Sequence, residues 1–515
     1  MKKSTAPARY LATLPTVFQS STERSHHISR AVKQGLARPL GHGLYTSNLD
    51  GDPVAIVQGR LWPIVAMLCP NATVGYRTAF EGRPATIDGR TVVFVVAGYP
   101  RRLELPGLVI QQVAGVSPHS DDKPFLGEGL RMASEHRQLL ENLVPSRGRG
   151  FGRRSVDKDA IEARLLGILK SSTGRDRLNQ IRDRARAAAP TLRLEASFDE
   201  LDQMIGALLA TKPAASLRST RVAAFLDGDG YDQPRLDLLA TLKLRLDLLP
   251  PVERHADFDQ ASFRHAAFFD AYFSNFIEGT EFEVEEAKGI LLDGRVPKAR
   301  PQDAHDILGT FDVVSSIRTM QHPPTDAASF IATIKQWHAV IMKGRPDRRP
   351  GEFKEVGNRA GGYDFVHPRE VLGTLHRGFD LLTGIEDPFS RAVFIMFLLA
   401  EVHPFDDGNG RTARAFMNAE LISRRRSRII IPSVYRYEYL SGLGRMSRDR
   451  DPTAMIKVMD YAHAFTHALD FTDLERATAT LERCNAFRRP GDGIKLQWPA
   501  EVKPYDRRIE DTGKN

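Results

Sequence analysis

The chain has 515 residues, of which 42% are hydrophobic and 26% are charged, a balance typical of folded globular proteins rather than of disordered or fibrous chains. Its length allows roughly three or four domains. The longest apolar run, residues 392–400, has about half of the length that a membrane-spanning helix needs. The N-terminus lacks a signal-peptide core, and the two cysteines, Cys69 and Cys484, lie too far apart to suggest a disulfide framework or a zinc site. We expect a cytoplasmic protein with no membrane partner.

The net charge of +8 is unevenly distributed along the chain. Residues 147–186 contain twelve Lys and Arg against five Asp and Glu. Such a stretch fits either a surface that follows phosphate groups or the solvated face of a helix. The sequence leaves both interpretations open.

Residues 1–48 are predicted to form a winged helix-turn-helix, placed at residues 16–45. Ser25 is a candidate N-cap, apolar residues follow at helical spacing, and Gly35 is a candidate stop before a short hairpin. This arrangement resembles the start of AbiEi-family antitoxin-like transcriptional regulators, which implies DNA binding; the alternative is a packing or protein-binding module of the same fold. The candidate DNA contacts on the helix that starts at Ser25 are Ser25, His26, His27, Arg30 and Lys33.

The next two segments differ in their apolar patterns. Residues 49–145 mix a helix signal near residues 59–69 with strand signals at 91–97 and 107–115, so we predict a small α+β domain. A loop rich in Gly, Arg and Ser follows. Residues 146–250 then carry apolar residues at helical spacing, which predicts an all-helical connector.

Residues 403–414, HPFDDGNGRTAR, are predicted to form a loop and the first turn of the helix that follows it. The apolar helix before the loop should end at Pro404, and a new helix should start after Gly410. Unpaired N–H groups and the helix dipole favour an anion at a helix N-terminus. Gly408 and Gly410 permit a phosphate group to approach the backbone closely.

The side chains of the same loop suit phosphate transfer. Arg411 and Arg414 lie on neighbouring positions of the first helical turn and can hold phosphate oxygens. Asp407 offers the carboxylate that a hard cation such as Mg²⁺ needs, and His403 is suited to take a proton from a hydroxyl group near neutral pH. These are the components that in-line transfer of a phosphate group requires.

The stretch resembles the signature of the Fic family at every specified position. The matching residues are His403, Phe405, Asp407, Gly408, Asn409, Gly410, Arg411 and Arg414. The resemblance implies transfer of AMP from ATP to a Ser, Thr or Tyr hydroxyl of a protein, with release of pyrophosphate. It implies the following roles: His403 as general base, Asp407 as Mg²⁺ ligand, Gly408, Asn409 and Gly410 as phosphate cradle, Arg411 and Arg414 as holders of the β- and γ-phosphates, and Phe405 as a buried pin of the loop. Doc-type kinases carry lysine at the position of Gly410, so AMP transfer is favoured over phosphate transfer. Phosphocholine transfer, which the resemblance also allows, stays an alternative.

A second resemblance concerns Ser274 and Glu278, which lie four residues apart on a predicted helix that starts near Asp259 and ends at Gly279. The pattern resembles the Fic inhibitory motif, in the class that carries it N-terminal to the core. It implies that Glu278 pairs with Arg414 and occupies the position that the γ-phosphate needs. The alternative is a surface glutamate beside a helix-ending glycine.

Residues 350–368 are predicted to contain a hairpin, and they resemble the Fic flap, whose edge strand aligns the target segment by strand addition. Lys354 stands where the family usually has arginine, and an ordinary surface hairpin is the alternative. Tyr435 and Tyr439 are candidate walls of the adenine site, with core packing as the alternative.

The predicted fold is therefore mainly α: a helical Fic core with a small β-hairpin flap in residues 251–470, preceded by the winged helix-turn-helix and the α+β domain, and followed by a helix and an extended tail in residues 471–515. The predicted activity is that of an autoinhibited, ATP- and Mg²⁺-dependent protein adenylyltransferase. Its expected partners are ATP and a target protein, with DNA and the chain itself, through self-modification or homo-oligomerisation, as further candidates. The alternatives are a DNA-binding, toxin-antitoxin-like regulator whose core senses nucleotide, and an enzyme that removes AMP.

Overall fold

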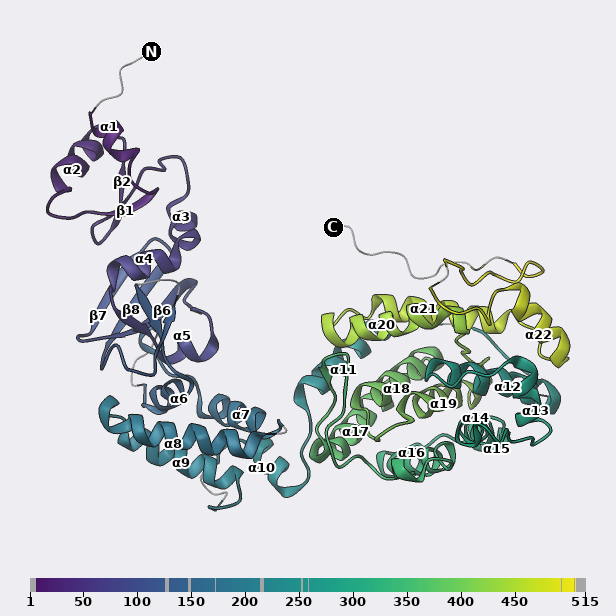
Figure 1. The fold of residues 1–515 in the computed structure, drawn as a ribbon. Helices are drawn as coiled ribbons and strands as arrows, with labels where there is room; N and C mark the ends of the chain where they lie inside the picture. Colours follow the sequence, from purple (N-terminus) through teal and green to yellow (C-terminus); the bar gives the residue numbers. More distant parts are fainter. Residues whose placement is uncertain are drawn as a thin grey trace, which may run out of the picture. The chain divides into compact units, whose positions relative to one another are not determined.

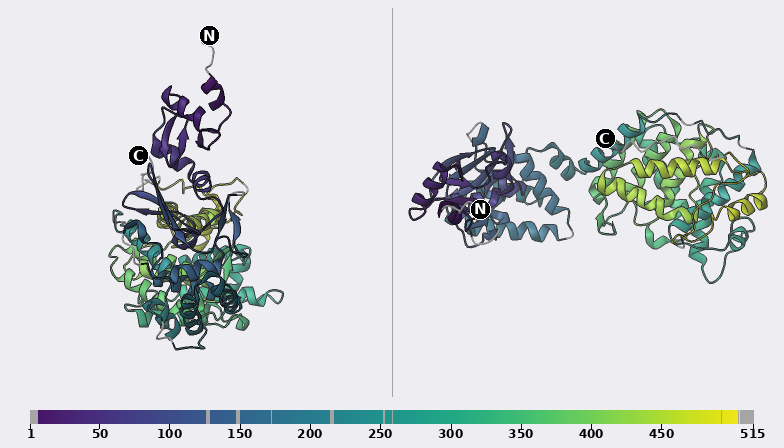
Figure 2. Two further views of the ribbon diagram at one scale, coloured as in Figure 1. Left: turned by 90° about the vertical axis from the view of Figure 1, so that its left-hand side faces the viewer. Right: turned by 90° about the horizontal axis from the view of Figure 1, so that it is seen from above.

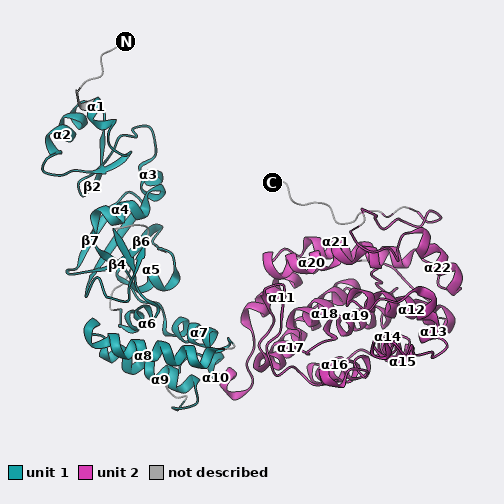
Figure 3. Ribbon diagram, in the orientation of Figure 1, with its two compact units in different colours: residues 1–223 teal, residues 224–515 magenta. Residues whose placement is uncertain are grey.

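The protein divides into two compact units, Met1–Ala223 and Ala224–Asn515, which Figure 3 shows in two colours. The boundary between the units falls inside the stretch 146–250 that the sequence assigns to one connector. The finer division into five domains stays a prediction. The computed structural model describes residues 6–125, 129–146, 150–171, 173–213, 217–251, 253–257, 259–491, 493–503 and 505.

The first unit begins with two helices and a three-stranded antiparallel sheet in the order β1-β3-β2 (Figure 1). Within residues 16–45 the structure has one helix, because Val17 and Phe18 are buried in strand β1 and the other helix, α1, lies before this segment. The second helix and the hairpin lie where they were expected, and the winged-helix assignment stays a prediction. The elements are α1 (Ala6–Leu11), β1 (Val17–Gln19), α2 (Ser25–Lys33), β2 (Arg38–Gly41) and β3 (Leu44–Thr46).

The ends of α2 only partly follow the expected capping pattern. Ser25 is the first helical residue, and the N-cap position belongs to Arg24. The hydroxyl of Ser25 donates to the carbonyl of Thr22 at 3.0 Å, so it does not cap the helix. Gly35 ends the helix as predicted, with φ of 66°.

A seven-stranded mixed sheet forms the middle of the first unit, in the order β7-β8-β6-β4-β10-β9 with β5 beside β6. Strand β6 alternates between two cores: Val93 and Val95 pack with α3 and α4, whereas Val92 and Phe94 pack on the opposite face. The predicted α+β character is confirmed. The elements are α3 (Pro53–Gly59), α4 (Leu61–Leu68), β4 (Ala72–Val74), α5 (Tyr76–Glu81), β5 (Ala85–Ile87), β6 (Arg90–Ala97), β7 (Arg101–Leu105), β8 (Leu108–Ala114), β9 (Lys123–Phe125) and β10 (Leu130–Met132).

Helices form the rest of the first unit, and they contain most of the basic residues of the stretch 147–186. On α8, Arg177 donates to Glu135, and both Arg182 and Arg186 lie within 3.8 Å of Asp202. These arginines are therefore paired with acidic side chains, which favours the helix-face interpretation of residues 147–186. The elements are α6 (Glu135–Leu143), η1 (Gly150–Gly152), α7 (Lys158–Leu169), α8 (Gly174–Leu192), α9 (Glu195–Leu208) and α10 (Thr220–Asp227), the last of which crosses the unit boundary.

The second unit is helical, as predicted, and is built around α18 and α19. Asp387 caps α18 by accepting the N–H of Ser390, and Pro388 occupies the first turn. Most of α18 is buried, and α20 and α21 cover one side of the unit, as the views of Figures 1 and 2 show. The elements are α11 (Gln233–Leu246), α12 (Gln260–Ile277), α13 (Val284–Leu291), α14 (Pro301–Val314), α15 (Ile317–Met320), α16 (Ala327–Ile341), η3 (Pro346–Arg348), β11 (Arg359–Ala360), β12 (Tyr363–Asp364), α17 (Pro368–Thr383), α18 (Pro388–Val402), α19 (Asn409–Ile422), η4 (Ser433–Tyr435), α20 (Arg436–Asp449), α21 (Thr453–His467) and α22 (Leu474–Arg483).

The C-terminal segment contains the predicted helix, α22, and then no further helix or strand among its described residues. Trp498 packs against Tyr461 and Phe465 of α21, so this part of the chain lies on the helical body. The end of the predicted tail, residues 506–515, lies outside the described residues. Within the described part of the chain, no helix has both the length and the apolar character needed to cross a membrane.

Candidate active site

The loop of residues 403–408, called the motif loop below, joins α18 to α19 in the second unit. Helix α18 ends at Val402, with His403 in a left-handed conformation (φ 51°). Helix α19 starts at Asn409, two residues earlier than predicted, so Gly410 lies in its first turn. Gly408 precedes α19 with φ of 73°, a backbone conformation that glycine adopts without steric cost.

Two side chains fix the shape of the motif loop. Asn409 both accepts the N–H of Phe405 and donates to its carbonyl, each at 2.9 Å. The ring of Phe405 is fully buried and stacks on the imidazole of His338 at 3.6 Å between ring centroids. Phe405 is therefore the expected pin of the loop. The side chain of Asn409 is used for hydrogen bonds within the loop, so a phosphate could be bound only by the backbone N–H of Asn409.

His338, on α16, supports the loop from below and was not foreseen from the sequence. Its Nε2 donates to the carbonyl of Asp407 at 2.9 Å, and its Nδ1 accepts the N–H of Gly351 at the same distance. Burial lowers the pKa of His338 to about 4, which keeps the ring neutral and this tautomer in place. A lone histidine in an apolar helix is usually a core residue, so the sequence carried no signal for this role.

His403 lines a cavity of about 470 Å³ beside the motif loop. Its ring stacks on Phe365 at 3.9 Å, and its Nδ1 lies 3.3 Å from the carbonyl of Ala400. Because a carbonyl only accepts, the proton belongs on Nδ1 and Nε2 keeps a free lone pair. Burial, together with the charge of Lys354, lowers the pKa of His403 to about 4. The neutral imidazole has the protonation state that a general base needs.

The predicted contact between Glu278 and Arg414 is present. Arg414 Nη2 lies 2.8 Å from Glu278 Oε1 and 2.9 Å from the carbonyl of Ser274, while Nε donates to the Ser274 hydroxyl at 2.9 Å. The guanidinium is buried, whereas 27% of the Glu278 side chain is exposed. Gly279, with φ of 92°, ends α12 directly after Glu278. Helix α12 thus directs one carboxylate at one arginine of α19.

Gly410 supplies the space in which that carboxylate lies. A Cβ atom at this position would stand 2.1 Å from Glu278 Oε1 and 2.9 Å from Arg414 Nη1, so any side chain would displace the pair. Glycine therefore leaves this space for a negatively charged group, and Glu278 fills it.

Arg411 does not line the cavity, although the sequence grouped it with Arg414 as a phosphate holder. Its Nη1 lies 3.1 Å from Asp306 Oδ2 on α14 and 3.4 Å from Asn275 Oδ1 on α12, and its side chain is only 3% exposed. The structure places it beneath the motif loop, with Nη2 at 3.8 Å from Asp407. Asp306 lies more than a hundred residues earlier in the chain, so sequence spacing could not reveal this pair.

Asp407 is the acidic residue that best fits a metal ion. Its Oδ1 accepts the N–H of Gly408 at 2.6 Å, and 41% of its side chain is exposed. No group of three or more His, Cys, Asp or Glu among the described residues could hold a metal on its own. The donor set therefore fits a Mg²⁺ ion that takes one carboxylate from the protein and its other ligands from phosphate and water.

A hairpin and α20 form the other walls of the cavity. The predicted hairpin consists of β11 and β12, joined by Gly361 and Gly362 with φ of 51° and 80°. Tyr439 of α20 lines the cavity, as predicted, and is buried. Tyr435 does not line it and packs against Tyr461, with ring centroids 5.5 Å apart. Of the two candidate walls for a base, the structure brings only Tyr439 to the site.

Lys354 connects the flap (residues 350–368) to the end of α18. Its Nζ donates to Asn358 Oδ1 at 2.6 Å and to the carbonyl of Val402 at 3.4 Å, and its backbone N–H donates to Pro404. Burial, followed by the nearby charge of Arg235, lowers the pKa of Lys354 to about 7. Lys354, whose role the sequence left open, thus links the flap to the end of α18 by hydrogen bonds.

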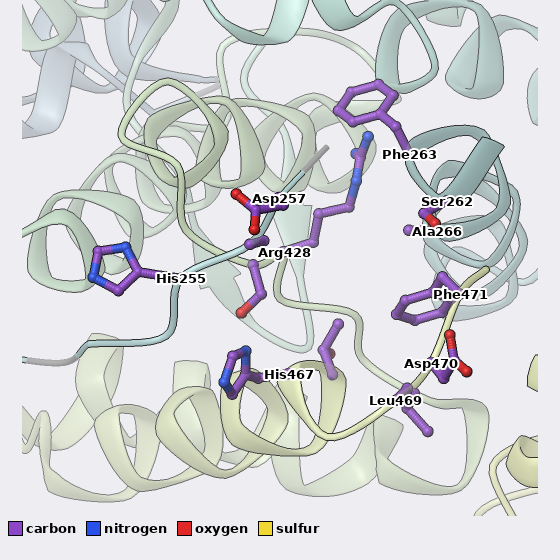
Figure 4. Close-up of a pocket in the computed structure, with 13 residues that line it drawn as sticks. His255, Asp257, Ser262, Phe263, Ala266, Arg428, His467, Leu469, Asp470 and Phe471 are labelled. Carbon is purple, nitrogen blue, oxygen red and sulfur yellow. The ribbon is translucent and has the colours of Figure 1, made fainter. Parts of the chain in front are cut away.

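A second pocket of about 240 Å³ lies elsewhere in the second unit (Figure 4). It shares no lining residue with the cavity at His403. Arg428, the buried charge in its wall, is paired with Asp270 at 2.9 Å and stacks on Phe263. This buried charge is thus paired within the protein, and the pocket holds none of the predicted site residues.

The candidate DNA contacts lie far from this site in the sequence, on α2 of the first unit. Ser25, His26, Arg30 and Lys33 are exposed. His27 is also exposed and stacks on Tyr10 at 4.8 Å. Arg30 and Lys33 form no ion pair with another described residue. Their charges are therefore available to a phosphate backbone, but no nucleic-acid contact follows from geometry alone.

Comparison with known proteins gives a match for part of the second unit. The model of the Fic/DOC family matches residues 329–421, which include the flap and the motif loop but not Glu278. Protein adenylyltransferase fic-1 of Caenorhabditis briggsae is 27% identical over 177 residues, which are 33% of this chain and 35% of the relative. Protein adenylyltransferase Fic of Drosophila melanogaster is 27% identical over 181 residues, with 33% and 36% covered. The chain thus spans about a third of the length of these curated relatives.

A solved structure of Fic-1 from C. elegans aligns with 66% of this chain and 96% of that chain, at 18% identity and a TM-score of 0.34. The domain assignment rests on the motif and on the family model.

Proposed function

Residues 329–421 of this chain form a Fic domain, and from this premise we propose that the protein is an adenylyltransferase that transfers AMP from ATP to a hydroxyl side chain of a protein target. The observation that carries the proposal is the cavity in which neutral His403 and buried Arg414 lie together, with the flap along one edge. The names of the curated relatives, which are protein adenylyltransferases, agree with it.

The proposed reaction is an in-line displacement at the α-phosphorus of ATP. Nε2 of His403 takes the proton of the target hydroxyl while that oxygen forms a bond to the α-phosphorus. The bond from this phosphorus to the bridging oxygen breaks, and pyrophosphate leaves with the bonding electrons. Backbone N–H groups at the start of α19 and the guanidinium of Arg414 stabilise the negative charge of the phosphates. Arg411, buried against Asp306, supports the loop from below in this account.

Asp407 would hold a Mg²⁺ ion together with the phosphates of ATP, because a hard cation prefers oxygen ligands and the Asp407 carboxylate is partly exposed. When bound, the ion would neutralise phosphate charge. Asp406 is engaged differently, in an ion pair with Arg349 at 3.0 Å. Replacement of Asp407, not of Asp406, should therefore raise the Mg²⁺ concentration that AMP transfer needs and lower its rate.

Glu278 acts as a brake in this proposal. Its carboxylate lies against Arg414 and in the space above Gly410, where a phosphate of a productively bound ATP would otherwise lie. Two negative groups cannot share one guanidinium at this distance without strong repulsion. ATP then binds weakly, or in an orientation that does not present its α-phosphorus to the target.

The position of the label in ATP tests the chemistry. The full chain with Glu278→Gly is incubated with Mg²⁺, cell lysate and ATP labelled on either the α- or the γ-phosphate. We expect protein-bound label from the α position only, and none with an additional His403→Ala change. Label from the γ position would indicate a kinase, and absence of label from both would contradict AMP transfer.

Removal of AMP from a modified protein is the alternative activity that uses the same residues. Glu278 lines the cavity and is partly exposed, so its carboxylate could orient a water molecule towards a phosphoester. The wild-type chain would then release label from proteins that the Glu278→Gly chain has modified. Unchanged label over the same period would argue against this alternative.

DNA binding by the first unit is a second candidate function, supported by the exposed side chains of Arg30 and Lys33 on α2. A gel-shift experiment with the DNA upstream of the gene tests it directly. Each of Arg30→Ala and Lys33→Ala should weaken binding and lower the salt dependence by about one unit of slope. A shift without AMP transfer would instead favour a regulator whose Fic domain senses nucleotide.

A further inference from the structure

The flap hairpin is too small to hold its own position. Strands β11 and β12 have two residues each, and three of these four residues are exposed. An isolated two-stranded hairpin is marginally stable in water even when it is longer. Yet Phe365, directly after β12, stacks almost parallel to the ring of His403, at an angle of 7°. Contacts with the helical body must therefore fix the hairpin.

Glu401 provides one such contact. It lies on α18, two residues before His403, and its side chain is only 2% exposed although it lines the cavity. Its carboxylate accepts hydrogen bonds from three elements: from Arg235 of α11, from the Tyr363 hydroxyl of β12, and from the Ser447 hydroxyl of α20 at 2.7 Å. A buried carboxylate is tolerated when it is paired in this way. Both of its oxygens are thus committed to protein donors.

The side chain of Arg235 contacts both a side chain and the backbone of the same strand. Its guanidinium lies over the ring of Tyr363, 4.4 Å from the centroid, and donates to the carbonyl of Asp364. The same guanidinium is paired with Glu401. Tyr363 therefore lies between a cation on its face and a carboxylate at its hydroxyl. These contacts are directional, so they specify one position of β12.

We propose that Arg235, Tyr363 and Glu401 form a clamp that holds the flap against His403, and that Arg235 and Glu401 are positioning residues for transfer to the protein acceptor. The effect on transfer rests on the proposed function, because only an acceptor aligned along the flap needs the flap in place. The clamp itself is a property of the fold. Its loss should free the hairpin and leave the motif loop intact, since the contacts of His338 and Asn409 with that loop involve none of the three clamp residues.

Hydrogen–deuterium exchange of the full chain tests the clamp directly. Tyr363→Phe keeps the ring and removes the hydroxyl, and Glu401→Gln keeps the shape and removes the charge. Losing a hydrogen bond to a charged group should speed exchange in the peptide of residues 355–366 by roughly tenfold or more. Glu352→Gln is the matched control, because Glu352 is an exposed glutamate in the same region that pairs with Lys335.

Faster exchange confined to the flap in both variants supports the clamp. Unchanged exchange in the flap, or an increase spread equally over α18 and α19, overturns it. This result does not depend on catalysis, so the clamp can stand even where the proposed function fails.

A kinetic comparison tests the positioning role. Arg235 does not line the cavity, so Arg235→Met in the Glu278→Gly chain should leave the affinity for ATP within about twofold of its parent. The initial rate of labelling of lysate proteins at saturating ATP should fall by roughly tenfold. An unchanged rate would overturn the positioning role. Absence of any label in the parent chain would instead count against the proposed function.

Discussion

Arg414 donates three hydrogen bonds to two neighbouring turns of α12, and its side chain is only 4% exposed. Breaking a buried pair by removal of one partner usually costs about 3–5 kcal/mol, because the other charge is left without compensation. In this site the replacement partner is a phosphate of ATP. A carboxylate and a phosphate therefore compete for one cation, and Glu278 has the advantage of being tethered to the protein.

His403 leads to a prediction on pH. Burial lowers its pKa to about 4, below its ordinary value of 6.5, so the base is neutral at pH 7 and is lost only as the pH falls through about 4. The rate of AMP transfer by Glu278→Gly should therefore show no acid-side inflection near 6.5. A pH–rate profile measures this. In Lys354→Met the inflection should move upward, because Lys354 contributes to the lowering of the pKa; an inflection near 6.5 in the parent chain would contradict the assignment.

At the scale of elements, the end of α12 determines where the brake points. Gly279 has φ of 92°, and a Cβ atom at this position would meet no other atom within 4 Å, so alanine would fit there but would strain the backbone. The strain costs about 1 kcal/mol, which is equivalent to roughly a fivefold change in an equilibrium. Gly279→Ala should therefore lower the melting temperature slightly. It should also raise AMP transfer several-fold over wild type, because the backbone at the end of α12 would shift to relieve the strain and would move Glu278 away from Arg414.

Gly228 offers a matched control for that prediction. It has φ of 88°, follows α10 and also has open space around it. Gly228→Ala should lower stability to a similar extent without an increase in AMP transfer. Equal activation in both variants would show that the effect comes from general loosening of the protein and not from the brake.

Apolar periodicity in the sequence predicted some of the helices and strands but not others. Both ends of α12 and the C-terminal end of α18 were predicted to within two residues, because helical spacing and helix-ending residues are local signals. Residues 16–19 lack such a signal, and pairing of β1 with β3 decides their structure. The start of α19 was misplaced because Asn409 closes the loop from within the helix.

At the scale of the whole molecule, the motif identified the residues of the site but not how they are supported. His403, Glu278 and Arg414 were found because their order in the chain is diagnostic. Asp306, His338, Arg235 and Glu401 were missed, since each contacts a partner that is distant in the sequence and that only folding brings close. Arg411 was predicted to hold phosphate groups together with Arg414. A sequence cannot show which of two neighbouring arginines is buried against another helix.

The most direct test of the account is the initial rate of protein labelling from ATP labelled on the α-phosphate, compared among wild type, Glu278→Gly and Glu281→Gly. Glu281 is a suitable control because it is a nearby glutamate paired with Arg489, not with Arg414. We predict that Glu278→Gly labels protein roughly tenfold to hundredfold faster than wild type, in line with the loss of a few kcal/mol of competition at Arg414, whereas Glu281→Gly behaves like wild type. Equal rates in all three chains would contradict the claim that Glu278 restrains an adenylyltransferase.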